Sequence, residues 1–308
     1  MTLPNFLILG AQKAGTTSLF NYLGQHPEVY ASPIKEPHFF DHEGERRPYA
    51  GPSRIPGPAV QSLKEYEGLF AGVRGEKAVG EASPTYLYLP GVAERVKRRL
   101  PEARLIAILR DPTARAYSAY QHAVRNGREP LRSFAAALAE EDRRVREGWH
   151  PIYHYRGRGF YHAQLSRYFD LFGREQVRVC LYDDLRSDPF GMLRGIFRFL
   201  GVSDSFTPDT STRYNLSGVP KNRAVAGLVK RLGGLTPAVK RVVPFETRQR
   251  IKGRIFVKAP PLEPAVRREL VEAYREDVLR LEGLIGRDLS AWLRAEPSPG
   301  GRVVGEGV

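Results

Sequence analysis

The sequence has very little cysteine: Cys180 is the only one among 308 residues. A single thiol cannot form an intramolecular disulfide, and it excludes a metal site built from several cysteines. Long hydrophobic runs are also missing, because no stretch of about 18 apolar residues, the length that crosses a bilayer, occurs in the chain. Residues 1–9 lack the basic region and cleavage site of a secretory leader. These absences together predict a cytoplasmic protein.

Acidic residues are also fewer than basic residues. The chain has 48 Lys and Arg residues against 34 Asp and Glu, which gives a formal net charge of +14. The excess is concentrated from Arg213 to Lys258, where twelve basic residues face one acid, Glu246, for a net charge of +11. Such a block predicts contact with an anion: a phosphorylated cofactor, an acidic acceptor, nucleic acid, or a membrane surface bound peripherally. A solvated arginine-rich face has the same composition, so both interpretations stay open.

Short apolar segments alternate with segments of helical periodicity along most of the chain. The strand candidates are residues 6–9, 77–80, 105–109 and 177–181. The helix candidates are residues 16–25, 92–100, 113–124, 134–146, 161–172, 190–200 and 264–284. This alternation predicts an α/β fold with a central, mostly parallel sheet that is flanked by helices on both faces.

No linker rich in serine and glycine divides the chain, so we predict a single domain over residues 1–295. Residues 44–61 are rich in Pro, Gly and Arg and are predicted to form a mobile surface loop. The apolar residues of the basic block are spaced as in an amphipathic helix, which predicts a basic helical region over residues 213–258. Residues 296–308 have the composition of a disordered tail.

The turn between the first strand and the first helix has the composition of an anion-binding loop. It reads Gly10-Ala11-Gln12-Lys13-Ala14-Gly15-Thr16-Thr17-Ser18. Backbone N–H groups in such a turn have no partner within the helix, and the helix dipole favours a negative charge beside them. A phosphate or sulfate can satisfy these groups, and Lys13 adds a positive charge. The loop is therefore a candidate phosphate site.

The position of Lys13 distinguishes this loop from that of a nucleotide triphosphatase. The triphosphatase signature places a lysine directly after the second glycine, followed by a Ser or Thr that binds Mg²⁺. In this chain Thr16 follows Gly15, and the lysine lies inside the loop. From there Lys13 can reach an oxygen that bridges a 5′-phosphate and its leaving partner, so no metal is expected. A P-loop kinase or NTPase remains the alternative.

A second anion site is predicted at the end of the strand that precedes Arg110. This residue lies at the edge where open α/β sheets bind ligands. Asp111 is expected to cap the next helix and Pro112 to occupy its first position. Ser118 and His122 lie on that helix, four residues apart and thus on one face. Arg110 with Ser118 can hold a phosphate, unless Arg110 merely pairs with Asp111 or with a helix end.

Four segments resemble, in the same order along the chain, the sulfotransferases that use 3′-phosphoadenosine 5′-phosphosulfate (PAPS). Residues 12–18 are similar to the loop that binds the 5′-phosphosulfate, and residues 109–112 with Ser118 to the 3′-phosphate segment. Residues 35–40, which read KEPHFF, are similar to a segment of the heparan sulfate N- and 3-O-sulfotransferase branch. Residues 218–223 resemble the late basic loop that closes over the nucleotide.

The resemblance implies a P-loop-like three-layer domain, PAPS as donor, adenosine 3′,5′-bisphosphate (PAP) as product and no required metal. It implies that Lys13 stabilises the bridging oxygen as it leaves and that Glu36 is the catalytic base. His122 and His38 correspond to histidines that matter in the N- and 3-O-sulfotransferases. In an extended segment Glu36 and His38 would point the same way. The residues implied to hold the donor are Gln12, Lys13, Ala14, Gly15, Thr16, Thr17, Ser18, Arg110, Ser118, Lys221, Asn222 and Arg223.

The acceptor is less well defined by the sequence. Heparan-type members usually carry Glu-Lys-Ser/Thr where this chain reads Glu81-Ala82-Ser83, and the missing lysine, expected beside the acceptor, argues against a heparan-like substrate. The acceptor is expected to be a hydroxyl or amine of a carbohydrate, lipid or natural product. Glu36 could instead be no more than a surface partner of Lys35. Glu81 could orient the acceptor or cap a strand.

A non-enzymatic protein that binds nucleic acid or another polyanion would also explain the positive charge. It would not explain why Lys13, Arg110 and Ser118 each fall at an expected ligand position of an α/β sheet. Sulfonate transfer from PAPS is therefore the favoured function, and no nucleic acid partner is expected.

Overall fold

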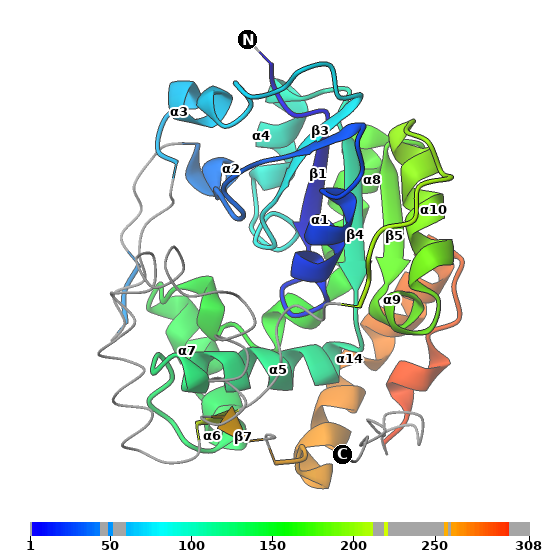
Figure 1. Ribbon diagram of the computed structural model, residues 1–308. Coiled ribbons are helices and arrows are strands. Elements are labelled where there is room, and N and C mark those ends of the chain that lie inside the picture. The colour runs from blue at the N-terminus through cyan, green and yellow to red at the C-terminus, as the bar shows by residue number, and fades with distance from the viewer. Residues whose placement is uncertain are drawn as a thin grey trace.

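A five-stranded sheet, in which every strand is parallel to its neighbours, lies at the centre of the molecule (Figure 1). The structure is a computed structural model that describes residues 2–43, 49–51, 60–211, 219–220, 256–257 and 260–295. In sheet order the strands are β2 (Val29–Ala31), β3 (Ala78–Ala82), β1 (Phe6–Gly10), β4 (Arg104–Leu109) and β5 (Val177–Leu181). The predicted α/β fold with a central parallel sheet is confirmed.

The order of the strands creates a topological switch point at the centre of the sheet. After β1 the chain runs to β2 and β3 on one side, and it then crosses β1 to add β4 and β5 on the other. The connections that leave the carboxyl ends of β1 and β4 therefore turn in opposite directions, and open α/β sheets bind ligands at such a point. The loop after β1 and Arg110 after β4 both lie at this edge, the lower end of the sheet in Figure 1.

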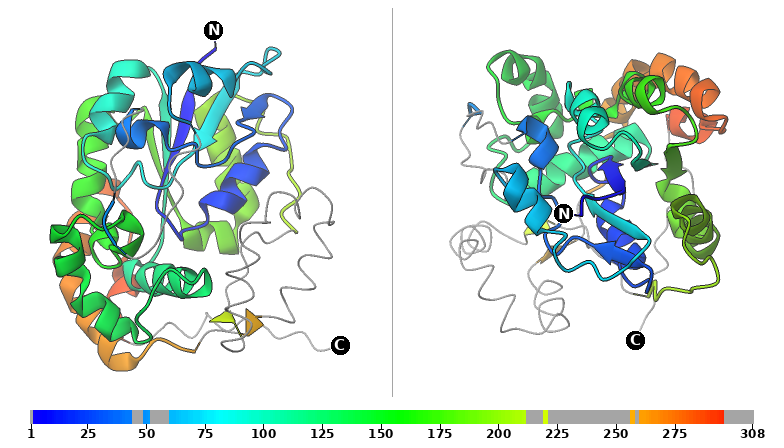
Figure 2. Two further views of the ribbon diagram at one scale, coloured as in Figure 1. Left: turned by 90° about the vertical axis from the view of Figure 1, so that its left-hand side faces the viewer. Right: turned by 90° about the horizontal axis from the view of Figure 1, so that it is seen from above.

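Helices cover both faces of the sheet, as the view from above in Figure 2 shows. One face carries α1 (Thr16–Leu23) and α10 (Pro189–Leu200), and the other carries α4 (Val92–Arg99), α8 (Tyr161–Phe172) and α14 (Pro264–Ile285). Below the carboxyl edge of the sheet, α5 crosses the molecule (Figure 1). The remaining helical elements are α2 (Phe39–His42), α3 (Leu63–Gly68), α5 (Pro112–Arg125), α6 (Phe134–Ala139), α7 (Glu141–Arg146), α9 (Tyr182–Ser187), and the 3₁₀ turns η1 (Pro151–Tyr153), η2 (Gly157–Gly159) and η4 (Ser290–Leu293).

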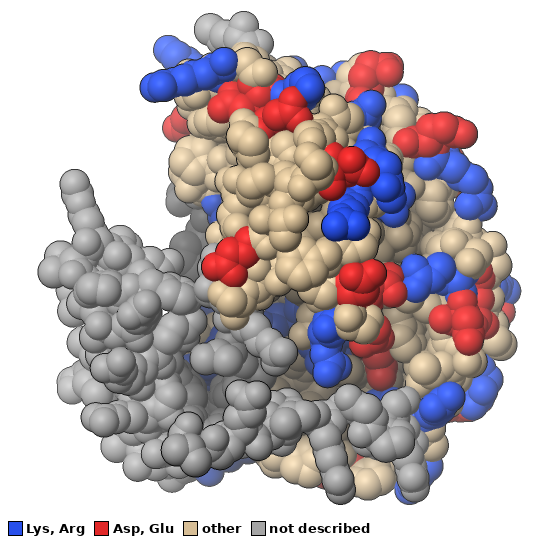
Figure 3. Space-filling model, turned by 45° about the vertical axis from the view of Figure 1, so that its right-hand side comes forward, with Lys and Arg blue, Asp and Glu red and all other residues tan. Residues whose placement is uncertain are grey.

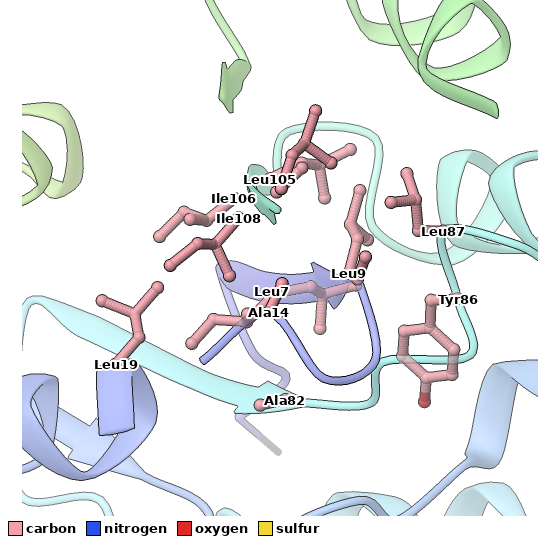
Figure 4. Packing of buried hydrophobic residues seen from close by; sticks show 14 of the residues in the cluster. Leu7, Leu9, Ala14, Leu19, Ala82, Tyr86, Leu87, Leu105, Ile106 and Ile108 are labelled. Atoms are coloured by element: carbon pink, nitrogen blue, oxygen red, sulfur yellow. The ribbon is translucent and has the colours of Figure 1, made fainter. Parts of the chain in front are cut away.

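The central strands form because they are continuous apolar runs, as is typical of parallel strands covered on both faces. All of β1 is buried, and in β4 only Arg104 is exposed. Burying an aliphatic side chain of this kind contributes about 1.5–3 kcal/mol. Figure 4 shows Leu7 and Ile108 from these strands with Ala14 from the following loop and Leu19 from α1, and all four are fully buried. The turn after β1 (residues 10–18), called the phosphate loop below after its predicted role, is thus anchored in the core through Ala14.

Most predicted elements are present, and the differences are local. The four predicted strands are observed within two residues of their predicted ends, whereas β2 was not predicted because its three residues are too few to show a periodicity. The single helix predicted over residues 134–146 is wrong, because α6 and α7 are separate helices that meet at Glu140. The short helices α2, α3 and α9 were also not predicted.

Three predictions fall largely on residues outside the described ranges. Of the predicted loop over residues 44–61, only five residues are described. Of the basic region over residues 213–258, the structure describes β6 (Val219–Pro220) and β7 (Phe256–Val257), which pair in antiparallel fashion, so the helix prediction is wrong for these four residues. The predicted tail over residues 296–308 lies outside the description. Among the helices that are described, none is both long and apolar enough to cross a bilayer.

Candidate active site

The backbone of the turn after β1 leaves several N–H groups available to a ligand. The N–H of Ala11 donates to the carbonyl of Ile108 on β4 (2.7 Å), which ties the loop to the neighbouring strand. Lys13 and Gly15 have positive φ angles of 70° and 99°, and Gly15 is the N-cap of α1. The first hydrogen bond inside α1 runs from the N–H of Leu19 to the carbonyl of Gly15 (3.0 Å). The preceding N–H groups of the first turn therefore have no partner within the helix and can bind an anion.

Gly15 is required because the start of α9 packs directly against the loop. A Cβ at this position would lie 3.0 Å from Cδ2 of Tyr182 and 3.1 Å from Cδ2 of Leu185. The ring of Tyr182 also supports the guanidinium of Arg110, whose Cζ is 4.9 Å from the ring centroid. Tyr182 was not predicted as a site residue, although its position directly after β5, at the carboxyl edge of the sheet, was a usable signal.

Arg110 is bound to the phosphate loop and not to its neighbour in the sequence. Its Nη1 donates to the carbonyl oxygen of Lys13 (3.1 Å), and its own carbonyl accepts from the hydroxyl of Tyr161 (3.0 Å). Asp111 instead caps α5, where it accepts from two backbone N–H groups of the first turn, and it pairs with Arg267 (3.2 Å). The predicted cap of α5 is confirmed, and the alternative in which Arg110 only neutralises Asp111 is wrong.

Lys13 lies in a cluster of positive charges. Its side chain is half-buried, and burial together with the charges of Arg125 and Arg110 lowers its pKa from 10.5 to about 8. Glu36 acts on Lys13 in the opposite direction, so the two side chains belong to one site. A bound anion would raise the pKa of Lys13 again. The cluster therefore favours an anionic ligand.

The other residues predicted to hold the donor differ in their placement. Thr16 is buried at the start of α1, and the side chains of Thr17, Ser18 and Ser118 are half-buried. The Oε1 atom of Gln12 is buried and has no hydrogen-bond partner in the described part of the chain, as expected of a polar group that meets a ligand. The structure does not describe the last three predicted residues, Lys221, Asn222 and Arg223.

The segment that carries Glu36 continues the sheet beside the end of β3. The N–H of Ser32 donates to the carbonyl of Gly80 (2.9 Å), and the N–H of Glu36 donates to that of Ala82 (3.0 Å). Glu36 and His38 both have left-handed backbones, with φ of 63° and 58°. The expectation of an extended segment is therefore wrong, because two left-handed residues bend the chain here. The bend still brings the two side chains together.

Glu36, His38 and Asp41 form a chain of acidic and basic groups. Nε2 of His38 is 3.7 Å from Oε2 of Glu36, while Nδ1 is 3.0 Å from Oδ2 of Asp41 and 2.9 Å from the hydroxyl of Thr85. Burial disfavours the charged ring of His38, but the two carboxylates outweigh this effect and raise its pKa to about 9. Burial also opposes the charge of Glu36, yet the nearby charged ring of His38 and the charge of Lys35 lower its pKa to about 2. Glu36 is therefore ionised at neutral pH.

Glu36 interacts with other residues of the site besides its surface partner Lys35. The two side chains do form an ion pair, and the side chain of Glu36 is 41% exposed. The same carboxylate, however, acts on both Lys13 and His38. Glu36 thus lies between the phosphate loop and solvent, where it can accept a proton.

His122, on α5, lies at the same site as a neutral ring. Its Nδ1 is 2.9 Å from Nη2 of Arg125, and its Nε2 is 3.0 Å from the side-chain amide of Asn126. Burial and the positive charges of Lys13 and Arg125 lower its pKa to about 3, and Glu36 opposes this shift. The structure thus brings together Lys13, Glu36, His38 and His122, which come from three separate parts of the sequence.

The position expected to lie beside the acceptor is buried in this chain. Ala82 ends β3 with 0% exposure, and Figure 4 shows it with the core residues of the sheet. The side chain of Ala82 therefore offers no polar group to an acceptor, and the expectation that the missing lysine bears on the acceptor stays a prediction. Glu81 and Ser83, on either side, are also fully buried.

Charge elsewhere is mixed, and the described ranges contain no recognisable metal cluster. On the face shown in Figure 3, Lys and Arg side chains alternate with Asp and Glu. No group of three or more His, Cys, Asp or Glu residues that could hold a metal ion occurs among the residues that the structure places. The site described above thus combines the turn after β1, the cluster of Lys13, Arg110 and Arg125, and the ionised carboxylate of Glu36.

Comparisons with known proteins point to one family. The sequence model of the sulfotransferase family matches residues 4–207. Among solved structures, a sulfotransferase from Alicyclobacillus acidocaldarius is 40% identical, with a TM-score of 0.73, and the match covers 96% of this chain and 100% of that one.

Curated relatives include longer proteins. The mouse bifunctional heparan sulfate N-deacetylase/N-sulfotransferase 4 is 28% identical over 304 residues, which are 96% of this chain and 31% of the mouse protein. The human bifunctional heparan sulfate N-deacetylase/N-sulfotransferase 3 is 27% identical over 306 residues, again 96% and 31%. The chain therefore spans about a third of the length of these relatives.

Proposed function

The chain belongs to the sulfotransferase family, and on that premise we propose that it transfers the sulfonate group of PAPS to a hydroxyl or amine of an acceptor. The observation that carries the proposal is the arrangement of Lys13 and Glu36. Lys13 lies in an anion-binding turn next to Arg110, and an ionised Glu36 lies close enough to shift the pKa of Lys13. This pairs a cation for the leaving group with a base for the attacking group.

The residues present fit a phosphorylated nucleotide donor. The free N–H groups at the start of α1, the buried orphan oxygen of Gln12 and the close approach that Gly15 permits all suit a 5′-phosphate. Arg110 and Ser118 would hold the 3′-phosphate, as the family resemblance implies. When bound, PAPS supplies the sulfonate group. Lys13 supplies the positive charge beside the oxygen that departs, and no divalent ion is needed for this role.

The reaction is an in-line displacement at sulfur. The acceptor oxygen or nitrogen forms a bond to sulfur, and its proton moves to a carboxylate oxygen of Glu36. The bond between sulfur and the 5′-phosphate oxygen breaks, and that oxygen keeps the electron pair. Lys13 neutralises the charge that develops there. His38, held by Asp41, orients Glu36, and the neutral His122, whose Nδ1 accepts from Arg125, lies beside them.

The acceptor class is a hydroxyl or amine of a carbohydrate, lipid or natural product. The relatives that are named for N-sulfation of heparan sulfate support an amino group on a glycan as one candidate. The alanine at position 82, where heparan-type members usually carry a lysine, argues against a heparan-like glycan. We retain a cytoplasmic location, and contact of the basic region with a membrane surface, as further predictions.

Transfer of radiolabel from [³⁵S]PAPS to a panel of acceptors tests the proposal. The panel contains de-N-sulfated heparin, a fully desulfated polysaccharide, a glycolipid and 4-nitrophenol, each assayed with and without EDTA. We expect labelled product from at least one acceptor, at the same rate with EDTA. Glu36→Gln should lose about 10²–10⁴-fold in rate, and Lys13→Ala at least about 10²-fold. The matched control is Glu272→Gln on the exposed face of α14, which should retain full activity.

Two results would contradict the proposal. Wild-type rates in both Glu36→Gln and Lys13→Ala would eliminate the assignment of base and leaving-group cation. Tight binding of a nucleoside triphosphate that is lost with EDTA would instead favour the P-loop kinase or NTPase.

A further inference from the structure

Glu81 is a fully buried carboxylate on β3 for which the mechanism above has no use. Its Oε2 accepts from the hydroxyl of Ser83 (2.9 Å), and its Oε1 lies 3.4 Å from the hydroxyl of Tyr66. The hydroxyl of Tyr86 also favours the charged form of this carboxylate. One carboxylate thus holds the hydroxyls of Ser83 and Tyr66, and none of the four side chains exposes more than a trace of surface.

The hydroxyls of Ser83 and Tyr86 bind the backbone of the turn that follows Glu36. The Oγ of Ser83 accepts from the N–H of His38 (3.2 Å), and the hydroxyl of Tyr86 accepts from the N–H of Phe40 (3.2 Å). A hydroxyl has one proton, so Ser83, which donates to Glu81, presents a lone pair to the N–H of His38. Glu81 therefore sets the direction in which the Ser83 hydroxyl acts.

The hydroxyl of Tyr66 belongs to a side chain that packs against the same turn. The ring of Tyr66 stacks on Phe39 at 4.5 Å between centroids, and it meets Phe40 edge-on at 5.4 Å. Both side-chain hydrogen bonds of Glu81 thus lead to residues 38–40. This turn directly follows Glu36 and contains His38, both in the left-handed region, a conformation that costs about 1–3 kcal/mol for each residue and persists only where the surroundings enforce it.

We propose that Glu81 is a positioning residue for sulfonate transfer: through Ser83 it holds the backbone of His38, and so fixes Glu36 against the acceptor. The inference rests on the proposed role of Glu36 as the base. Glu81 touches no reacting atom, since it is fully buried and lies beneath the turn that it supports.

A pH dependence follows from the surroundings of Glu81. Burial raises its pKa to about 7, the hydrogen bonds from Tyr86 and Ser83 and the charge of His38 oppose this rise, and the charge of Asp41 adds to it. Below this pH Glu81 gains a proton and becomes a donor, so at least one of its hydroxyl partners must turn. Glu36 and His122, with pKa values of about 2 and 3, titrate too low to produce the same effect. Turnover should therefore fall on the acid side with an apparent pKa near that of Glu81.

The test compares Glu81→Gln with Glu141→Gln. Glu141 is also buried (2% exposed) and accepts from two backbone N–H groups, but it supports the turn at Arg156 and Gly157 instead. In Glu81→Gln we expect turnover with the fastest acceptor of the panel to fall about 10–100-fold at pH 8, as for a base displaced by about 1 Å. The acid limb of the pH profile should disappear. PAP affinity, measured by isothermal titration calorimetry, should stay within about twofold, and Glu141→Gln should leave turnover and the limb unchanged.

Amide hydrogen exchange gives a readout that needs no acceptor. The amide of His38 should exchange about tenfold faster in Glu81→Gln than in the wild type, as expected for the loss of one net hydrogen bond. If Glu81→Gln does not fold, the Ser83→Ala variant provides the test. This variant should accelerate amide hydrogen exchange at His38 and lower turnover, while PAP still binds.

Three results would overturn the inference. These are unchanged exchange at His38, an acid limb that persists in Glu81→Gln, and a loss of PAP affinity that matches the loss of turnover. Failure of the proposed function looks different, because it appears as full activity in Glu36→Gln, whatever the exchange at His38 shows.

Discussion

Replacing Lys13 with methionine is expected to stabilise the protein while it weakens donor binding. Burial and the neighbouring Arg125 and Arg110 lower the pKa of Lys13 from 10.5 to about 8. One pKa unit corresponds to about 1.4 kcal/mol, so keeping Lys13 charged in the folded protein costs about 3 kcal/mol at neutral pH. Methionine has a similar length and no charge. The free energy of unfolding without donor should therefore rise by up to about 3 kcal/mol.

Urea denaturation followed by circular dichroism measures this change as a higher midpoint with an unchanged slope. The gain should be full below pH 8, where the wild-type folded state holds a charged Lys13. It should shrink as the pH rises from about 8 toward 10.5, because Lys13 then loses its proton in the folded state. PAP affinity should fall more than about tenfold, since a charged hydrogen-bond donor is lost.

The exposed Lys64 supplies the control, because Lys64→Met removes the same charge from the surface and should change neither stability nor PAP affinity by much. A Lys13→Met variant that unfolds at the same or a lower urea concentration than the wild type would refute the reasoning. In that case the charge of Lys13 would not be destabilised by burial and by Arg125 and Arg110. The electrostatic argument that places Lys13 beside the leaving oxygen would then fail.

Three further predictions concern single positions. Gly15→Ala should weaken PAP binding, measured by calorimetry, more than about tenfold, because its φ is 99° and a Cβ would lie 3.0 Å from the ring of Tyr182; unchanged affinity would contradict this. Gly80→Ala should lower the free energy of unfolding by about 3 kcal/mol in urea, because its Cβ would lie 2.5 Å from backbone and ring atoms of β1; a wild-type midpoint would disprove it. Asp41→Asn should lower the pKa of His38 from about 9 in an NMR titration and reduce the stability that the charged ring contributes, which is full below pH 6.5 and lost as the pH rises through about 9. An unchanged titration would show that Asp41 does not set this charge.

The phosphate loop could be predicted from sequence because its signals are local. An apolar strand, a glycine turn and a helix follow one another within residues 6–23, and the fold places each of them where the pattern predicts. Arg110 was predictable for the same reason, since it directly follows a buried strand. The identity of its partner was not, because the carbonyl of Lys13 lies 97 positions away along the chain.

The surroundings of Glu36 could not be predicted from local pattern. An extended segment was expected, but the left-handed backbones of Glu36 and His38 depend on hydrogen bonds from β3 and from the residues that follow it. Thr85 contacts His38 from 47 positions away, and no spacing rule links them. The burial of Ala82 is likewise a consequence of sheet register, where it lies opposite Ile8.

The two halves of the site are held by adjacent strands of one rigid sheet. The loop with Lys13 leaves β1, while the segment with Glu36 is hydrogen-bonded along β3, the strand that pairs with β1 on the side away from β4. Neighbouring strands are about 4.8 Å apart, so the sheet itself sets the separation between the cation and the base. Sites on such rigid elements keep their geometry when surrounding loops change. Acceptor preference can therefore vary through the helices and loops below the sheet while the groups that transfer sulfonate stay in place.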